Sequence, residues 1–225
     1  MGSTRTRALT TPSRHPERAH HDAATVNSIL DEAIFGHLAF VADGLPQALP
    51  LLFVRVDSEI FLHSSTGARP ARILARKESI EAAFEVTILD ELVLARSTFN
   101  HSANYRSVVA HGPLRLVTDE GRKASVLEQM VEKIVPGRSS DVRAADGDEL
   151  RQTAVMSLPL DTAAAKVRTG DPTDEERDLT SSVYAGRLPL LSGRGRPIAA
   201  ANLDPAVAVP SYLEEPLVTT HTTKR

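Results

Sequence analysis

The feature that most constrains the fold is a series of short apolar stretches separated by tight-turn signals. The clearest case is Asp43-Gly44, which stands between "HLAFVA" and "LPQALPLLFVRVD". An Asp-Gly pair between alternating stretches is the strongest local signal for a β-hairpin. Pro46 and Pro50 place the start of the return strand at a sheet edge or a bulge, because proline donates no ladder hydrogen bond.

The same pattern continues along the chain. Strands are predicted at 37–44, 45–57, 58–65, 79–89, 92–98, 105–117 and 154–160, with Asp90 and Glu91 between the fourth and fifth. Helices are predicted at 23–35, 67–77 and 119–135, and a further one opens at 170–179. Asp22 is the expected N-cap of the first helix, and Gly36 its expected end. Six or seven short strands linked by tight turns predict a closed antiparallel barrel with peripheral helices.

Composition narrows the class of protein. The 225 residues have a net charge of −3 and are 41% hydrophobic, which suits one core with an extension. The weakly acidic balance argues against a nucleic-acid partner, which requires a basic face. The absence of cysteine removes disulfides and thiolate ligands and fits a cytoplasmic protein. No apolar run approaches the roughly 20 residues that span a bilayer, so no membrane association is expected.

Composition also divides the chain into three parts. Residues 1–21 are rich in arginine and interrupted by proline, which indicates a flexible N-terminal arm. Residues 22–170 contain the predicted strands and form the barrel domain. Residues 171–225 are rich in proline, glycine and small residues after their first turn. They are expected to form an extended C-terminal tail on the barrel or on a partner subunit.

The stretch "FLHSSTGARPAR", residues 61–72, is the first candidate site. A predicted strand ends in the hydroxyl side chains Ser64, Ser65 and Thr66, and Arg69 and Arg72 follow at a helix start. Helix amides with nearby hydroxyl and guanidinium groups form phosphate sites. An ordinary helix cap with solvated arginines is the competing interpretation. The glycine and lysine spacing of a Walker loop is absent.

The strand "NYRSVVAHG", residues 104–112, is the second candidate. By alternation Tyr105, Ser107 and His111 share one face, and Arg106 lies on the other. A cation on a barrel strand requires an acidic partner, for which Glu85 is a candidate, or an anionic ligand. The spacing of the histidines does not require them to converge, so no metal site is predicted.

Taken together, "GHLAFVADGLPQALPLLF", "FLHSSTGAR", "LDELVLARSTFNHSANYRSVVAHG" and "ELRQTAVMSLPL" resemble the pyridoxamine 5'-phosphate oxidase-like family. The likeness is greatest to its flavin-nucleotide-binding subgroup, which includes nitroimidazole-resistance proteins, and it spans about residues 22–190. The resemblance implies a six-stranded antiparallel split β-barrel that works as a homodimer, with FMN at the subunit interface.

The resemblance also implies roles for individual residues. Pro50 and Leu51 would line the flavin ring system, and the segment from His63 to Arg69 would hold the ribityl chain and phosphate. Tyr105, Arg106 and Ser107 would complete the site. His63 is the first candidate for a proton donor. His111 stands where relatives commonly have a bulky apolar residue, so it could tune a flavin or bind a haem iron.

Three functions follow from this resemblance. The leading one is an oxidoreductase that moves a hydride or electrons from NAD(P)H through FMN to a small acceptor, such as a nitroaromatic or quinone-like compound. The second is a haem protein with His63 or His111 as axial ligand. The third is a non-catalytic flavin-binding or flavin-sensing protein.

Overall fold

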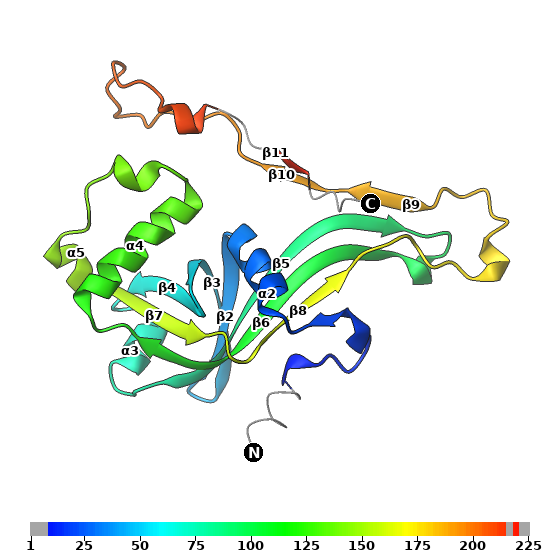
Figure 1. The fold of residues 1–225 in the computed structure, drawn as a ribbon, viewed down its shortest axis with the longest axis horizontal. Helices are drawn as coiled ribbons and strands as arrows, with labels where there is room; N and C mark the ends of the chain where they lie inside the picture. The colour runs from blue at the N-terminus through cyan, green and yellow to red at the C-terminus, as the bar shows by residue number, and fades with distance from the viewer. Residues whose placement is uncertain (1–8, 215–217, 221–225) are drawn as a thin grey trace. The chain divides into compact units, whose positions relative to one another are not determined.

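The computed structural model describes residues 9–214 and 218–220. Its chain contacts divide into two compact units. The first unit contains Met1–Ile88 and Arg106–Val167, and the second contains Leu89–Tyr105 and Arg168–Arg225. Two long strands, β5 (Ile80–Leu94) and β6 (Ser102–Leu116), run from one unit into the other (Figure 1).

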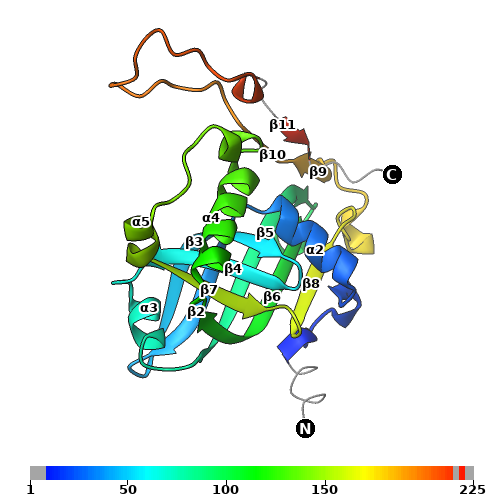
Figure 2. The same ribbon diagram turned by 60° about the vertical axis from the view of Figure 1, so that its left-hand side comes forward.

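The first unit is mainly strand. Its other strands are β1 (Ala19–His20), β2 (Phe35–Ala42), β3 (Leu45–Val56), β4 (Glu59–Ser65), β7 (Thr153–Pro159) and β8 (Ala163–Arg168), whose last residue belongs to the second unit. Its helices are α2 (Ala23–Glu32), α3 (Arg69–Leu74), α4 (Glu120–Ile134) and α5 (Gly147–Gln152), with short 3-10 turns η1 (Pro16–Arg18) and η3 (Arg138–Ser140). Figures 1 and 2 show α4 beside the β3–β4 side of the sheet.

Six strands close into a ring, which confirms the predicted barrel. The sheet order is β6-β7-β4-β3-β2-β5, and an additional pairing between β6 and β5 joins its two ends. β8 and then β1 extend the sheet beyond β6. Closure leaves fewer free sheet edges, which otherwise invite pairing with other chains.

The β2–β3 hairpin forms as predicted. Asp43 and Gly44 both have positive φ, 53° and 75°, as a two-residue hairpin loop of this kind requires. β3 pairs with β2 along Leu45–Leu52 and with β4 only from Phe53 onward. Pro46 and Pro50 therefore lie where β3 has a single hydrogen-bonded neighbour, in agreement with their expected edge position.

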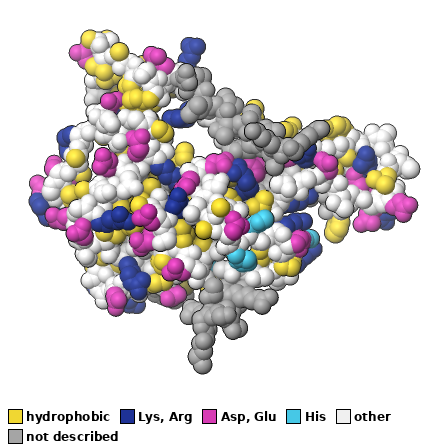
Figure 3. Space-filling model, in the orientation of Figure 1, with side chains coloured by type: hydrophobic (Ala, Val, Ile, Leu, Met, Phe, Trp, Pro, Cys, Tyr) yellow, Lys and Arg dark blue, Asp and Glu magenta, His cyan; other side chains and the backbone are white. Residues whose placement is uncertain are grey.

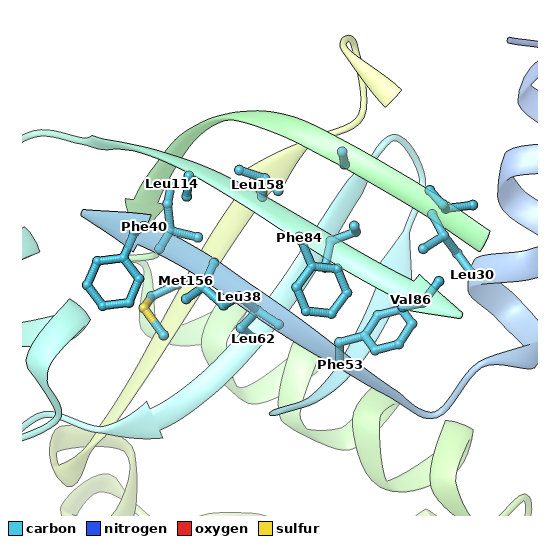
Figure 4. Packing of buried hydrophobic residues seen from close by; sticks show 14 of the residues in the cluster. Leu30, Leu38, Phe40, Phe53, Leu62, Phe84, Val86, Leu114, Met156 and Leu158 are labelled. Atoms are coloured by element: carbon cyan, nitrogen blue, oxygen red, sulfur yellow. The ribbon is translucent and has the colours of Figure 1, made fainter. Parts of the chain in front are cut away.

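The barrel interior is a closely packed apolar core. Figure 4 shows aromatic and aliphatic side chains from β2, β3, β4, β5, β6 and β7 meeting inside the ring. The rings of Phe53 and Phe84 pack edge to face at 4.9 Å between centroids. Leu30 brings α2 into the same core, and the Asp22 carboxylate caps that helix by accepting from the Thr25 amide.

Four local predictions are wrong. β5 is one continuous strand, because Asp90 and Glu91 are buried within it instead of forming a break. β8 is a strand that the alanine-rich stretch "AAAKVR" did not indicate. Residues 170–179 contain only the 3-10 turn η4 (Glu176–Asp178). Gly36 lies inside β2, and α2 ends at Glu32.

The second unit has its own polar interior. The buried Asn104 side chain donates to the buried Glu91 carboxylate and accepts from Arg168. Arg187 lies 3.4 Å from Glu91, on β9 (Gly186–Pro189), which pairs with the end of β5. The remaining elements are the 3-10 turns η2 (Thr98–Asn100) and η5 (Ser211–Leu213) and the paired strands β10 (Leu191–Gly193) and β11 (Val218–Thr220).

The surface carries no long charged field on the face that Figure 3 presents. Acidic and basic side chains are interspersed there. Among the residues that the structure describes, no helix is long and apolar enough to cross a membrane.

Candidate functional site

Three alanines form a row on the outer face of the barrel. Ala39 on β2 is paired with Ala48 on β3 and with Ala83 on β5, so the three lie side by side across the sheet. Ala39 and Ala48 are exposed, and Ala83 is half-buried. Methyl side chains leave the backbone surface open over three strands. We refer to Ala39, Ala48 and Ala83 as the alanine shelf.

The shelf belongs to a longer exposed strip on β2. Phe35, His37, Ala39 and Val41 alternate with buried residues and therefore point to the same, outer side. Phe35 is 52% exposed and Val41 is 65% exposed. A monomer rarely leaves such a line of apolar side chains in water without a ligand or partner to cover it.

A cationic cavity lies at the hairpin end of this strip. Its volume is about 530 Å³, and Val41 is one of its lining residues. Its charged lining residues are Arg69, Arg72, Arg76, Lys77 and Asp43. Four cations and one carboxylate give the lining a formal charge of +3. The apolar strip thus leads, through Val41, to a cavity with a positively charged lining.

The local sequence explains why α3 presents these cations. Pro70 suits the first turn of a helix, and with Ala71 and Leu74 it is buried against the barrel. Arg69 and Arg72 fall on the opposite side and remain exposed. The Arg69 guanidinium also donates to the Gln47 side chain on β3 at 3.2 Å.

The predicted hydroxyl residues lie beside the cavity but do not line it. Ser65 Oγ accepts from the Gly67 amide at 3.2 Å, so it shapes the turn before α3. Ser64 donates to the Ser65 carbonyl, and the Thr66 amide donates to the Gln152 carbonyl. Of the predicted phosphate-binding residues, the structure brings Arg69 and Arg72 into the cavity.

His37 is a candidate ligand residue that the sequence pattern did not indicate. Its Nδ1 lies 3.5 Å from the Glu85 carboxylate on β5, and its ring meets Phe35 edge to face at 6.3 Å between centroids. A carboxylate beside one ring nitrogen orients an imidazole and leaves the other nitrogen available as a ligand. The alternation of β2 could have indicated the exposure of His37, but only the strand register shows Glu85 opposite it.

His63 is on β4 and lies apart from the exposed strip of β2. It is half-buried under α4, with its Nδ1 2.9 Å from the Met130 sulfur. Burial lowers the pKa of His63, which favours the neutral imidazole. His63 is not among the residues that line the cationic cavity. Its role as a proton donor stays a prediction.

Pro50 and Leu51 face opposite sides of β3. Pro50 is exposed and paired with His37, so it adjoins the alanine shelf. Leu51 packs against the barrel core instead. Only Pro50 is therefore available to a group on the outer face.

The "YRS" strand is satisfied within the chain. The Arg106 guanidinium donates twice to the Glu32 carboxylate at the end of α2, once at 2.8 Å. The predicted Glu85 partner is wrong, because Glu85 faces His37. Ser107 donates to the Lys166 carbonyl, and Tyr105 belongs to the second unit. An anionic ligand is thus not needed to explain Arg106.

His111 lies on the outer side of β6 and is half-buried. Burial lowers its pKa, and its backbone amide donates to the Thr162 carbonyl at 2.8 Å. Within the described residues, no group of three or more His, Asp or Glu side chains is arranged to hold a metal ion.

The fold and the sequence together define the class. Residues 22–167 match the family model for pyridoxamine 5'-phosphate oxidase, and the chain belongs to this family. No protein of curated function matches the chain.

Two solved structures resemble nearly the whole chain. The flavocytochrome Anf3 from Azotobacter vinelandii is 32% identical, with a TM-score of 0.83 over 91% of this chain and 94% of that one. An FAD and haem binding protein from Mycobacterium smegmatis is 31% identical, with a TM-score of 0.81 over 87% of this chain and 95% of that one.

A third structure shares the fold alone. It is described as a putative 5-nitroimidazole antibiotic resistance protein from Bacteroides thetaiotaomicron. It is 18% identical, with a TM-score of 0.55 over 66% of this chain and 86% of that one.

Proposed function

We propose that the outer face of β2, β3 and β5 binds a flavin nucleotide in a redox protein of the flavocytochrome type. The observation that carries the proposal is the continuity of the alanine shelf with the cationic cavity through Val41. A flavin nucleotide has the matching form, with a planar ring system at one end and phosphate at the other. The ring system would lie on the shelf, and Arg69 and Arg72 would hold the phosphate.

The relatives favour FAD over the FMN expected from the sequence, and the cavity offers cations for both of its phosphates. Arg69 and Arg72 are enough for one phosphate monoester, and Arg76 and Lys77 remain for a second phosphate. The two relatives that cover most of the chain are described as a flavocytochrome and as an FAD and haem binding protein. Denaturing the purified protein and separating the released flavin by chromatography distinguishes FAD from FMN.

The same relatives suggest haem as a second prosthetic group. His37 is the axial ligand that the geometry favours, because its Nδ1 lies 3.5 Å from the Glu85 carboxylate and the side chain is exposed on the outer face. His63 and His111 are the alternatives expected from the sequence. A Soret band that His37→Ala removes, and that His63→Ala and His111→Ala retain, would support this assignment. Loss of the band in His63→Ala or His111→Ala would assign the axial ligand to that histidine instead.

The proposed activity is oxidoreduction. A bound flavin supplies transfer of a hydride or electrons from a nicotinamide donor to a small acceptor, such as a nitroaromatic or quinone-like compound. The chain's own contribution is to orient the ring system on the shelf, to anchor phosphate through α3 and to keep water from the covered strip. A protein that retains flavin yet shows no turnover with NADH or NADPH would instead be a flavin carrier or sensor.

A second copy of the chain is the proposed cover for the strip. Phe35, Val41 and Leu45 are all exposed at this hairpin, and a homodimer would bury them over the prosthetic group.

The absorption spectrum of the purified protein tests the proposal. We expect flavin absorbance, and we expect Arg69→Ala with Arg72→Ala to lower flavin retention at least tenfold. Arg115→Ala, an exposed arginine on β6, is the matched control and should retain flavin. A colourless protein that ignores added FAD and FMN would refute the proposal.

A further inference from the structure

A second cavity lies between α4 and residues 139–149. Its volume is about 750 Å³, within the range of ligand pockets. One row of α4 side chains, which includes Val126 and Met130, packs in the core against β3, β4 and β7. The cavity is lined instead by another row of the same helix and by the segment that follows it. The apolar lining residues are Ala124, Leu127, Val131, Val142, Ala144 and Ala145.

The walls of this cavity are held in place by hydrogen bonds. The Glu132 carboxylate accepts from the Gly137 amide at 2.7 Å and from Ser139 Oγ at 2.6 Å. Arg143 donates twice to Glu149, at 2.8 and 2.6 Å, and Asp146 forms a capping box with Glu149 at the start of α5. Hydrogen bonds thus tie the segment that frames the cavity to α4 and α5.

The cavity is slightly acidic. Its charged lining residues are Glu128, Arg143 and Glu149, which give a formal charge of −1. Arg143 is already paired with Glu149. The exposed Glu128 is therefore the charged lining residue that can pair with a cation of the occupant. An occupant should therefore be apolar with a cation beside it.

The second unit contains a segment with that chemistry. Residues 191–203, "LSGRGRPIAAANL", carry Arg194 and Arg196 and no acidic residue. Ile198 is 96% exposed and Leu191 is 63% exposed. Beyond β10 these residues form no helix or strand, and the glycines and proline favour an extended course. Ile198, two residues after Arg196, is thus an exposed aliphatic side chain close to a cation.

We propose that residues 191–203 of one copy dock in the α4 cavity of a second copy, with Ile198 in the apolar floor and Arg196 beside Glu128. Exchange in both directions gives a closed, two-fold symmetric contact. A buried aliphatic anchor with a rim charge pair is the arrangement that gives most of the binding free energy in protein interfaces. The inference rests on the proposed homodimer and is independent of the prosthetic group.

Cross-linking tests the proposal directly, because the chain has no cysteine of its own. Tagged Ser125→Cys chains are co-expressed with untagged Ala199→Cys chains, purified by the tag and treated with a short bis-maleimide. Ser125 lines the cavity, and Ala199 follows Ile198. We expect a covalent dimer of one tagged and one untagged chain. Tagged Thr87→Cys, an exposed position on β5, is the control and should not cross-link to Ala199→Cys.

Each other outcome overturns the proposal. A chain that carries both Ser125→Cys and Ala199→Cys and cross-links only within itself would show docking in the same copy. Equal cross-linking with the Thr87→Cys control, or none, would show no specific docking. A dimer by light scattering without the cross-link would refute this inference alone, whereas a monomer would refute the proposed homodimer as well.

A charge exchange gives an independent readout. Ile198→Asp should raise the dimer dissociation constant at least tenfold, as measured by light scattering on dilution. Glu128→Arg should weaken the dimer less, and Glu128→Arg with Arg196→Glu should restore it. Asp204→Arg is the matched control in the same extension. A double variant no stronger than Glu128→Arg alone would refute the pairing of Glu128 with Arg196.

Discussion

At the scale of single residues, Lys133 shows how the fold accommodates a largely buried cation. Lys133 on α4 reaches back to donate to the Leu30 carbonyl at 2.8 Å, near the end of α2. Its ammonium also lies 3.6 Å from the centroid of the Phe53 ring. The Lys133 ammonium therefore links α4 to α2. The Leu30 carbonyl and the Phe53 ring stabilise its charged form, whereas burial disfavours that form.

Lys133 should make stability depend on alkaline pH. Burial lowers its pKa from 10.5 to about 8. Between these values the folded protein has lost a proton that the unfolded chain keeps, so unfolding takes up a proton and its free energy rises with pH. Relative to Lys133→Met, the wild type should gain about 1–2 kcal/mol between pH 7 and 9.5, less than the full shift because the side chain is partly exposed.

Urea unfolding at both pH values measures this difference. Lys77→Met, an exposed substitution on the same unit, should show no such change. The neighbouring charges are Asp31 and Arg55, which pair with each other at 2.7 Å, and the substitution leaves both in place. An unchanged difference between wild type and Lys133→Met across this range would contradict the prediction.

Arg106 gives a second prediction at this scale. Its guanidinium is half-buried and is paired with Glu32, so Glu32→Gln leaves it with a weaker neutral partner. We expect a loss of about 1–2 kcal/mol in the free energy of unfolding, with flavin retention unchanged. Chemical denaturation and the absorption spectrum measure the two effects separately. A loss of flavin without a loss of stability would instead place Arg106 at the prosthetic group.

At the scale of elements, β2 carries both the core and the candidate site. Its inward residues pack in the barrel, and its outward residues form the exposed strip. Gly36 lets the strand approach β5 closely, since a Cβ there would lie 2.4 Å from Phe84 Cζ and 2.7 Å from the Glu85 carbonyl oxygen. The same close approach keeps Glu85 beside His37.

Gly36→Ala should therefore be strongly destabilising. The added methyl group meets backbone as well as the Phe84 ring, so the strands must separate, and we expect a loss of about 2–4 kcal/mol in the free energy of unfolding. Gly67→Ala, where the nearest atom lies 3.6 Å away, is the matched control. Thermal and chemical denaturation of both variants make the comparison. Equal stability of the two would show that β2 and β5 can adjust.

At the scale of the whole molecule, the barrel supplies a surface and a second copy is proposed to complete it. Ala39 is exposed, so a larger side chain there costs the isolated chain little, yet it raises the floor of the shelf. Ala39→Leu should keep the melting temperature within a few degrees and lower flavin retention at least tenfold. Thr87→Leu, exposed on β5, should leave both unchanged. Full flavin retention by Ala39→Leu would remove the shelf from the site.

Local signals in the sequence are enough to predict the class of fold. The Asp43-Gly44 turn, the Asp22 cap and the alternation of β2 are local signals, and local backbone chemistry is enough to produce each of them. The cations of α3 were visible for the same reason, because Arg69 and Arg72 stand close together in the chain. The extra strand β8 and the unbroken course of β5 were not visible, since pairing and burial override weak local preferences there.

Which side chains meet depends on long-range pairing in the folded barrel. Ala39, Ala48 and Ala83 are far apart in the sequence and become one shelf through the register of three strands. His37 acquires Glu85, and Arg106 acquires Glu32 and not Glu85, by the same kind of long-range pairing. A shift of one residue in register would turn each of these side chains to the other face. Composition and local pattern do not encode that choice, because it is made by the packing of the barrel as a whole.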